Sequence, residues 1–118
     1  MARAGRFETF MTFVVTESCI RCKYTDCVDV CPTDAFREGS NFLAIDPDDC
    51  IDCRLCVPEC PVSAIFDERD IPLAQRPFID VNRQLAKTWR MIARGKAPLP
   101  DADYWANVED KARFLDRT

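Results

Sequence analysis

Two short runs of β-branched, aromatic and aliphatic residues mark the first half of the chain. They cover residues 12–16 and residues 41–45. Residues of these types are enriched in β-strands, so both runs predict short strands. Residues 33–36 and 62–66 are expected to lead back into a second short strand in each half. We expect the antiparallel strands to pack against two short helices, which is an α+β architecture.

The region from residue 71 onward has a helical rhythm instead. Its first apolar residues recur at three- and four-residue steps, at Phe78, Val81, Leu85, Trp89 and Ile92. This spacing predicts one amphipathic helix, with Gly95 as its C-cap. A proline-rich linker then leads to Asp101 or Asp103 as an N-cap, and a last short helix is expected over residues 107–115. We interpret the apolar stripe as core packing, with partner docking as the alternative.

Cysteine carries the candidate chemistry. All eight cysteines fall into two runs that end in Cys-Pro. The runs are Cys19-x2-Cys22-x4-Cys27-x3-Cys31-Pro32 and Cys50-x2-Cys53-x2-Cys56-x3-Cys60-Pro61. Runs of this kind bind iron-sulfur clusters, and the fourth cysteine of one run ligates the cluster of the other. The sequence therefore predicts a protein with two clusters, joined to cysteine alone.

The two runs differ by an insertion. Cys19 and Cys22 each precede their counterparts by 31 residues, whereas Cys27 and Cys31 precede theirs by 29. Two extra residues thus lie between Cys22 and Cys27. A metal-thiolate bond is only about 2.3 Å long, so an insertion in so tight a loop displaces a ligand, and Cys22 is the candidate.

Two cluster assignments follow from the insertion. In the first, a 3Fe-4S cluster is held by Cys19, Cys27 and Cys60. A 4Fe-4S cluster then takes the remaining four ligands, which are Cys31, Cys50, Cys53 and Cys56. In the second assignment the longer loop rearranges, Cys22 binds, and both clusters are 4Fe-4S.

Other uses of paired cysteines fit less well. Structural zinc sites usually separate two Cys-x2-Cys pairs by a longer stretch and often include histidine, which this chain lacks. Disulfides suit an oxidising compartment, and no secretory signal is evident. We therefore interpret the cysteines as cluster ligands.

Several segments resemble the seven-iron bacterial ferredoxins. The matching stretches are residues 13–20, 22–27, 50–53, 78–82 and 98–102. The resemblance implies one 3Fe-4S and one 4Fe-4S cluster in a pseudo-twofold ferredoxin-like fold. It also implies that a C-terminal extension wraps the cluster core and shields it.

These observations divide the chain into three parts of a single domain. Residues 1–11 form an N-terminal extension for which disorder is the default expectation. Residues 12–70 form the two-cluster core, and residues 71–118 form an extension packed on it. A short core interrupted by eight cysteines depends on metal ligation for much of its folding free energy.

Charge is distributed unevenly between these parts. Residues 17–70 carry thirteen acids and five bases, and the rest of the chain carries seven acids and eleven bases. An acidic face around a redox centre steers association with a basic partner, although ordinary solvated surface explains many of these carboxylates as well. No basic, aromatic surface suggests nucleic acid, and no run of about 20 apolar residues suggests a membrane span. We expect a cytoplasmic monomer.

The expected function is electron transfer, with no enzymatic activity. A soluble carrier would pass single electrons between a ferredoxin reductase and acceptor oxidoreductases. An iron or redox sensor and a relay subunit of a larger complex are the alternatives. Asp26, next to Cys27, is proposed as a proton carrier coupled to reduction of the three-iron cluster, and a solvated loop aspartate is the alternative.

Overall fold

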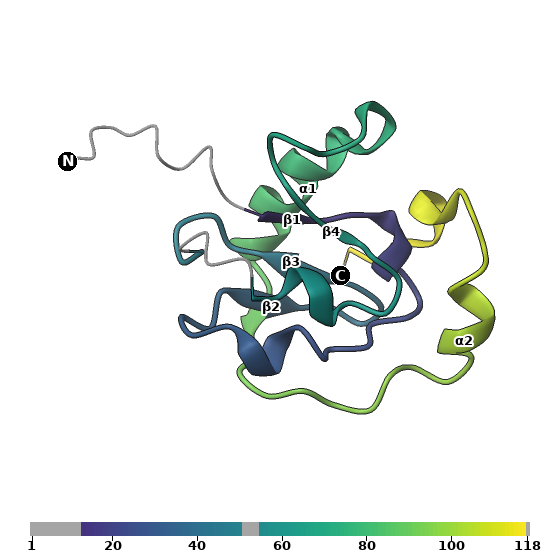
Figure 1. Cartoon of the computed structure of the whole chain (residues 1–118), viewed down its shortest axis with the longest axis horizontal. Helices are drawn as coiled ribbons and strands as arrows, with labels where there is room; N and C mark the ends of the chain where they lie inside the picture. The colour runs from purple at the N-terminus through teal and green to yellow at the C-terminus, as the bar shows by residue number, and fades with distance from the viewer. Residues whose placement is uncertain (1–12, 51–54, 118) are drawn as a thin grey trace.

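The computed structural model describes residues 13–50 and 55–117, and its regular elements are all short (Figure 1). The strands are β1 (Phe13–Val15), β2 (Phe36–Glu38), β3 (Leu43–Ile45), β4 (Ile65–Asp67) and β5 (Arg90–Met91). The α-helices are α1 (Pro77–Ala86) and α2 (Ala102–Trp105). Five 3-10 turns complete the described chain: η2 (Glu17–Cys19), η3 (Val28–Val30), η4 (Val57–Glu59), η5 (Leu73–Gln75) and η6 (Lys111–Phe114). The fold is therefore a small α+β fold.

The strands form two antiparallel sheets that frame the cysteine runs. β1 pairs with β4, with Phe13 opposite Asp67. β2 pairs with β3 on one edge and with β5 on the other, and Phe36 lies opposite Ile45. Because β1 precedes the first cysteine run and β4 follows the second, their pairing brings the outer ends of the two runs together. The hairpin of β2 and β3 connects their inner ends.

The predicted strands are confirmed within the described residues. Residues 12–16 correspond to β1, although Thr12 lies outside the described part of the chain. Residues 41–45 correspond to β3, and the two predicted returns lead into β2 and β4. The two short helices expected after the strands are only single 3-10 turns, η3 and η4, because a cysteine lies immediately before and after each turn.

Helix α1 packs on β1 and β3 and joins the two sheets through one side chain. Asn82 is 2% exposed, and its Oδ1 accepts hydrogen bonds from Val15 N at 3.0 Å and Ile45 N at 2.9 Å. Its Nδ2 donates to Val15 O and Phe78 O, each at 2.8 Å. Three of these bonds satisfy backbone groups of β1 and β3 that would otherwise be buried without partners: the N–H and carbonyl of Val15 and the N–H of Ile45.

The predicted amphipathic helix is too long. α1 ends at Ala86, so Trp89 and Ile92 lie beyond it, and Gly95 does not cap it. Trp89 instead packs edge-on against Phe42, with ring centroids 6.3 Å apart, and the N–H of Ile92 donates to the carbonyl of Phe36. The apolar spacing continues past the helix because Trp89 and Ile92 still pack into the core from either side of β5, whose own two residues are exposed. The periodicity did not predict this strand.

The rest of the C-terminal region is mostly irregular. Asp101 precedes α2 as predicted, but its φ is 62° and its side chain makes no capping hydrogen bond. The last predicted helix, residues 107–115, is only the turn η6. In Figure 1 this stretch follows the outside of the core from β5 to α2 and then to η6.

Candidate iron-sulfur site

The described cysteines occupy matching places in the two runs. Cys27 and Cys31 flank turn η3, and Cys56 and Cys60 flank turn η4. Cys19 ends turn η2. Cys53, a proposed ligand, lies outside the described residues. The backbone therefore presents the second halves of the two runs, Cys27 to Cys31 and Cys56 to Cys60, in the same local form.

Each Cys-Pro turn supplies a hydrogen bond to sulfur. The N–H of Ala35 donates to Cys31 Sγ at 3.4 Å, and the N–H of Ala64 donates to Cys60 Sγ at 3.3 Å. In both turns the residue before alanine is left-handed, with φ of 52° at Asp34 and 54° at Ser63. This turn points the alanine N–H back at the cysteine, and such bonds stabilise negative charge on sulfur.

Three cysteines of the candidate three-iron set act on one another electrostatically. Burial raises the pKa of Cys19 to about 12; a hydrogen bond from the backbone of Leu43 opposes the rise, and Cys60 adds to it. Burial also raises the pKa of Cys27 well above its usual range, with Cys19 and Cys60 again adding to it. The structure thus brings the buried Cys19 and Cys27 within electrostatic range of each other and of the half-buried Cys60.

Polar side chains stabilise the loops that carry the candidate ligands of the four-iron cluster. Thr33 Oγ1 donates to Asp49 O at 2.6 Å and lies 3.7 Å from Cys31 Sγ, which ties the end of the first run to the start of the second. Arg37 donates to the carboxylates of both Asp46 and Asp49. These contacts hold the loop that leads into Cys50.

Cys22 points into the C-terminal extension. Its side chain is fully buried, and its Sγ donates to Ala102 O at 3.4 Å. Lys111 Nζ donates to the same sulfur at 3.4 Å. Burial raises the pKa of Cys22, and the ammonium of Lys111 opposes part of that rise. A carbonyl oxygen can only accept a hydrogen bond, so this geometry describes a protonated thiol.

The insertion is held in place by the same extension. Backbone φ is positive at Arg21, Lys23 and Thr25, in alternation along the loop. Thr25 Oγ1 donates to Lys96 O and accepts from Lys96 N, both at 2.7 Å. The N–H of Leu99 donates to the carbonyl of Cys22 at 3.2 Å. Non-glycine residues with positive φ persist where the surroundings over-determine the backbone, as the extension does here.

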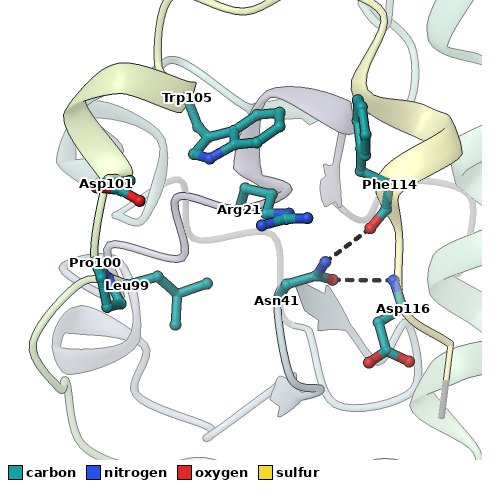
Figure 2. Close-up of a pocket in the computed structure, with 8 residues that line it drawn as sticks. All are labelled: Arg21, Asn41, Leu99, Pro100, Asp101, Trp105, Phe114 and Asp116. Carbon is teal, nitrogen blue, oxygen red and sulfur yellow. Dashed lines mark hydrogen bonds between the residues drawn. The ribbon is translucent and has the colours of Figure 1, made fainter.

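Arg21, an exposed residue of the first run, contacts two aromatic rings of the extension. Its guanidinium carbon lies 4.7 Å from the centre of the Trp105 ring and 5.7 Å from that of Phe114. Figure 2 shows these groups around a pocket of about 440 Å³ at the junction of the extension and the core. In the same view Asn41 bonds to the backbone of Phe114 and of Asp116.

Sequence reasoning missed these anchoring residues. Thr25, Asn41 and Lys111 have their partners 71 to 93 positions away in the chain. Only the two-residue insertion pointed to this loop. Asp26, the proposed proton carrier, is exposed immediately before Cys27.

The donor set fits an iron-sulfur cluster. No disulfide links the seven described cysteines to one another. Within residues 13–50 and 55–117, no three cysteine or acidic side chains converge closely enough to hold a single metal ion. Sulfurs around a cluster bind different irons and stand farther apart than ligands of one ion. An α+β fold whose buried cysteines receive backbone N–H bonds is that of an iron-sulfur protein.

Comparisons with known proteins agree with this class. Residues 18–64 match the family model of a 4Fe-4S dicluster domain, and residues 76–117 match that of a domain of unknown function. A ferredoxin of Rickettsia felis is 48% identical over 105 residues, which cover 86% of this chain and 92% of that protein. Ferredoxin-1 of Caulobacter vibrioides is 47% identical over 95 residues, covering 80% and 83%. The chain belongs to the ferredoxin family.

Membership of this family makes the chain an iron-sulfur electron-transfer protein. Among the described residues, no helix combines the length and the apolar character needed to cross a membrane.

Proposed function

We propose that the chain is a one-electron carrier with one 3Fe-4S and one 4Fe-4S cluster. Cys19, Cys27 and Cys60 hold the three-iron cluster. The four-iron cluster is held by Cys31, Cys50, Cys53 and Cys56. When bound, the clusters supply single-electron exchange, so the protein needs neither a substrate pocket nor an acid-base pair.

The single observation that carries this proposal is the hydrogen bond from Cys22 to Ala102 O. A sulfur that donates its proton to a carbonyl is not a thiolate ligand. Cys22 is then the one cysteine of eight that is left out, and the first cluster keeps three ligands. Residues 71–118 act in this proposal as a cover over residues 12–70, within one domain.

An iron count with electron paramagnetic resonance tests the assignment. The sample is full-length protein, purified without oxygen and then oxidised. About seven irons per chain and a strong signal from the oxidised protein are expected of the uneven pair. About eight irons, with no signal before reduction, would mean that Cys22 completes a second 4Fe-4S cluster.

One observation favours the second cluster assignment, in which Cys22 binds and both clusters are 4Fe-4S. Cys60 contributes to the raised pKa of Cys22, so the two sulfurs are near each other. A rotation of the Cys22 side chain away from Ala102 would bring it toward the first site. The sensor alternative, in which gain of a fourth iron changes partner binding, depends on this rotation.

The proposed partners are a ferredoxin reductase and acceptor oxidoreductases. The excess of acids in residues 17–70 suits a partner with a basic surface, because opposite charges raise the rate of encounter. We propose a reducing interior as its location, as a cytoplasmic monomer, since free thiols and oxygen-sensitive clusters persist there.

Asp26 is proposed as a proton carrier for the first site. It is exposed to solvent and adjacent in sequence to the ligand Cys27, so it can take up a proton from water when reduction adds negative charge nearby. Asp26→Asn is expected to slow protonation of the reduced site and flatten the pH dependence of its reduction potential, measured by voltammetry. Asp48→Asn, also at an exposed carboxylate, is the control. A pH dependence equal to that of the unmodified protein in Asp26→Asn would reject the role.

A further inference from the structure

Lys111 is a buried cation in an unusual setting. Its residue is 1% exposed, and it reaches the first cysteine run from turn η6. Lys111 Nζ donates to Ser18 O at 2.7 Å, Trp105 O at 3.0 Å and Cys22 Sγ at 3.4 Å. Lysine is almost never fully buried unless it is paired with an opposite charge, so this position calls for a reason.

No carboxylate neutralises this ammonium among the described residues. The ion pairs there involve Lys23, Arg37, Arg69, Arg83 and Lys96. The carboxylate of Glu17 accepts a hydrogen bond from the backbone N–H of Lys111 at 3.4 Å and not from its Nζ. The carboxylate of Asp103 contributes to the raised pKa of Cys22, and its Oδ1 accepts a hydrogen bond from the Tyr24 hydroxyl.

The thiol does not neutralise it either. Cys22 donates to Ala102 O and so carries its proton. Burial outweighs Lys111 in setting its pKa, which is raised overall. The ammonium is thus bound by two carbonyl oxygens and one neutral sulfur. None of these three groups carries an opposite charge.

The charge lies beside the first cluster site. Ser18, whose carbonyl it binds, directly precedes Cys19. Cys22, whose sulfur it binds, contributes to the raised pKa of Cys19, and Cys60 contributes to the raised pKa of Cys22. A positive charge in a buried site of low dielectric stabilises any negative charge added nearby.

We infer that Lys111 is the residue that raises the reduction potential of the first-run cluster relative to the second. The ammonium favours the reduced state because reduction adds one electron next to an unneutralised positive charge. This inference rests on the proposed function, because it requires a first-run cluster beside a Cys22 that keeps its proton and does not ligate the cluster. Lys111 acts on the cluster through space and does not ligate it.

Reduction potentials of both clusters in Lys111→Met test the inference. Methionine keeps much of the apolar stem and removes the charge. The equilibrium constant for reducing the first-run cluster is expected to fall about tenfold, which is about 59 mV for one electron. The second-run cluster is expected to shift less. Voltammetry gives the potentials, and electron paramagnetic resonance assigns each one to its cluster.

Two control variants separate charge from packing. Lys111→Arg keeps the charge and is expected to restore most of the potential. Lys87→Met makes the same charge change at an exposed lysine and is expected to leave both potentials unchanged. An unshifted first-run potential in Lys111→Met, or an equal shift in Lys111→Arg, would overturn the inference.

Failure of the variant to assemble is also informative. Lys111→Gln, which keeps an N–H donor for the carbonyls, is the second neutral variant. If neither neutral variant assembles a first-run cluster while Lys111→Arg does, Lys111 has a structural role and the inference is wrong. A first-run cluster missing from the unmodified protein, seen in its iron count, would instead reject the proposed function.

Discussion

At the scale of the residue, both cysteine runs are organised around hydrogen bonds to sulfur. Ala35 and Ala64 donate to sulfurs that are proposed as ligands. Cys22 differs because its sulfur both donates and accepts within the extension. The proposed ligands Cys31 and Cys60 accept hydrogen bonds through sulfur, whereas the proposed free thiol of Cys22 also donates one.

Replacement of Cys22 is therefore expected to leave the clusters intact. Cys22→Ala removes two buried hydrogen bonds and costs about 1–3 kcal/mol of stability, but it removes no ligand in our assignment. About seven irons per chain and an unchanged signal of the oxidised protein are expected, by iron analysis and electron paramagnetic resonance.

The matched variant is Cys19→Ala, at a cysteine that is buried to a similar degree. It removes a proposed ligand and is expected to lower the count to about four irons, with loss of that signal. Loss of iron in Cys22→Ala to the extent seen in Cys19→Ala would contradict the assignment.

At the scale of the element, α1 holds the two sheets together. β1 belongs to the two-stranded sheet and β3 to the three-stranded one, and the side chain of Asn82 bonds to the backbone of both. No other hydrogen-bonding residue of the described helix is buried as deeply. The amide of Asn82 is thus one of the groups that fix the two sheets relative to each other.

Asn82→Ala is expected to be strongly destabilising. It leaves the N–H and carbonyl of Val15 and the N–H of Ile45 without this partner, and each unsatisfied buried group costs about 1–3 kcal/mol. A loss of at least about 3 kcal/mol is expected, measured as a lower guanidinium concentration at half-loss of cluster absorbance. Gln84→Ala, at an exposed position of α1, is the control. Equal midpoints for the two variants would show that Asn82 is not the connection between the sheets.

The element scale also shows how far the sequence could be interpreted. The four strands of the core were predictable because short β-branched and aromatic runs flank the cysteines. The end of α1 was not, since Trp89 and Ile92 continue the apolar spacing after the helix has stopped. β5 depends on pairing with β2, which no local pattern records.

At the scale of the whole molecule, the spacing of the cysteines predicted the cluster site, but it did not predict which residues of the C-terminal extension would contact it. The offsets between the cysteines of the two runs locate the insertion from the sequence alone. The residues that hold the insertion, Lys96 and Lys111 among them, lie in a distant segment, and an ordinary lysine in sequence gives no sign of burial. Long-range contacts of this kind become visible only in three dimensions.

Removal of iron is expected to unfold the protein. The strands of the core are three residues long, and non-glycine positive φ angles at Arg21, Lys23, Thr25, Asp34 and Ser63 each cost about 1 kcal/mol. Metal ligation offsets these costs, as it does in other small metalloproteins. Chelation is expected to abolish the near-ultraviolet circular dichroism of the two tryptophans. A metal-free chain with a native spectrum would show that the apolar core suffices.

The contacts of the extension with the first run also set an order of events during synthesis. A ribosome releases the chain from its N-terminus, so both cysteine runs emerge before Lys96, Leu99 and Lys111. Until those residues arrive, nothing bonds to Thr25 Oγ1, the carbonyl of Cys22 or its sulfur as they do in the finished fold. The nascent first run accordingly acquires its final set of bonds only after residue 111 has been made.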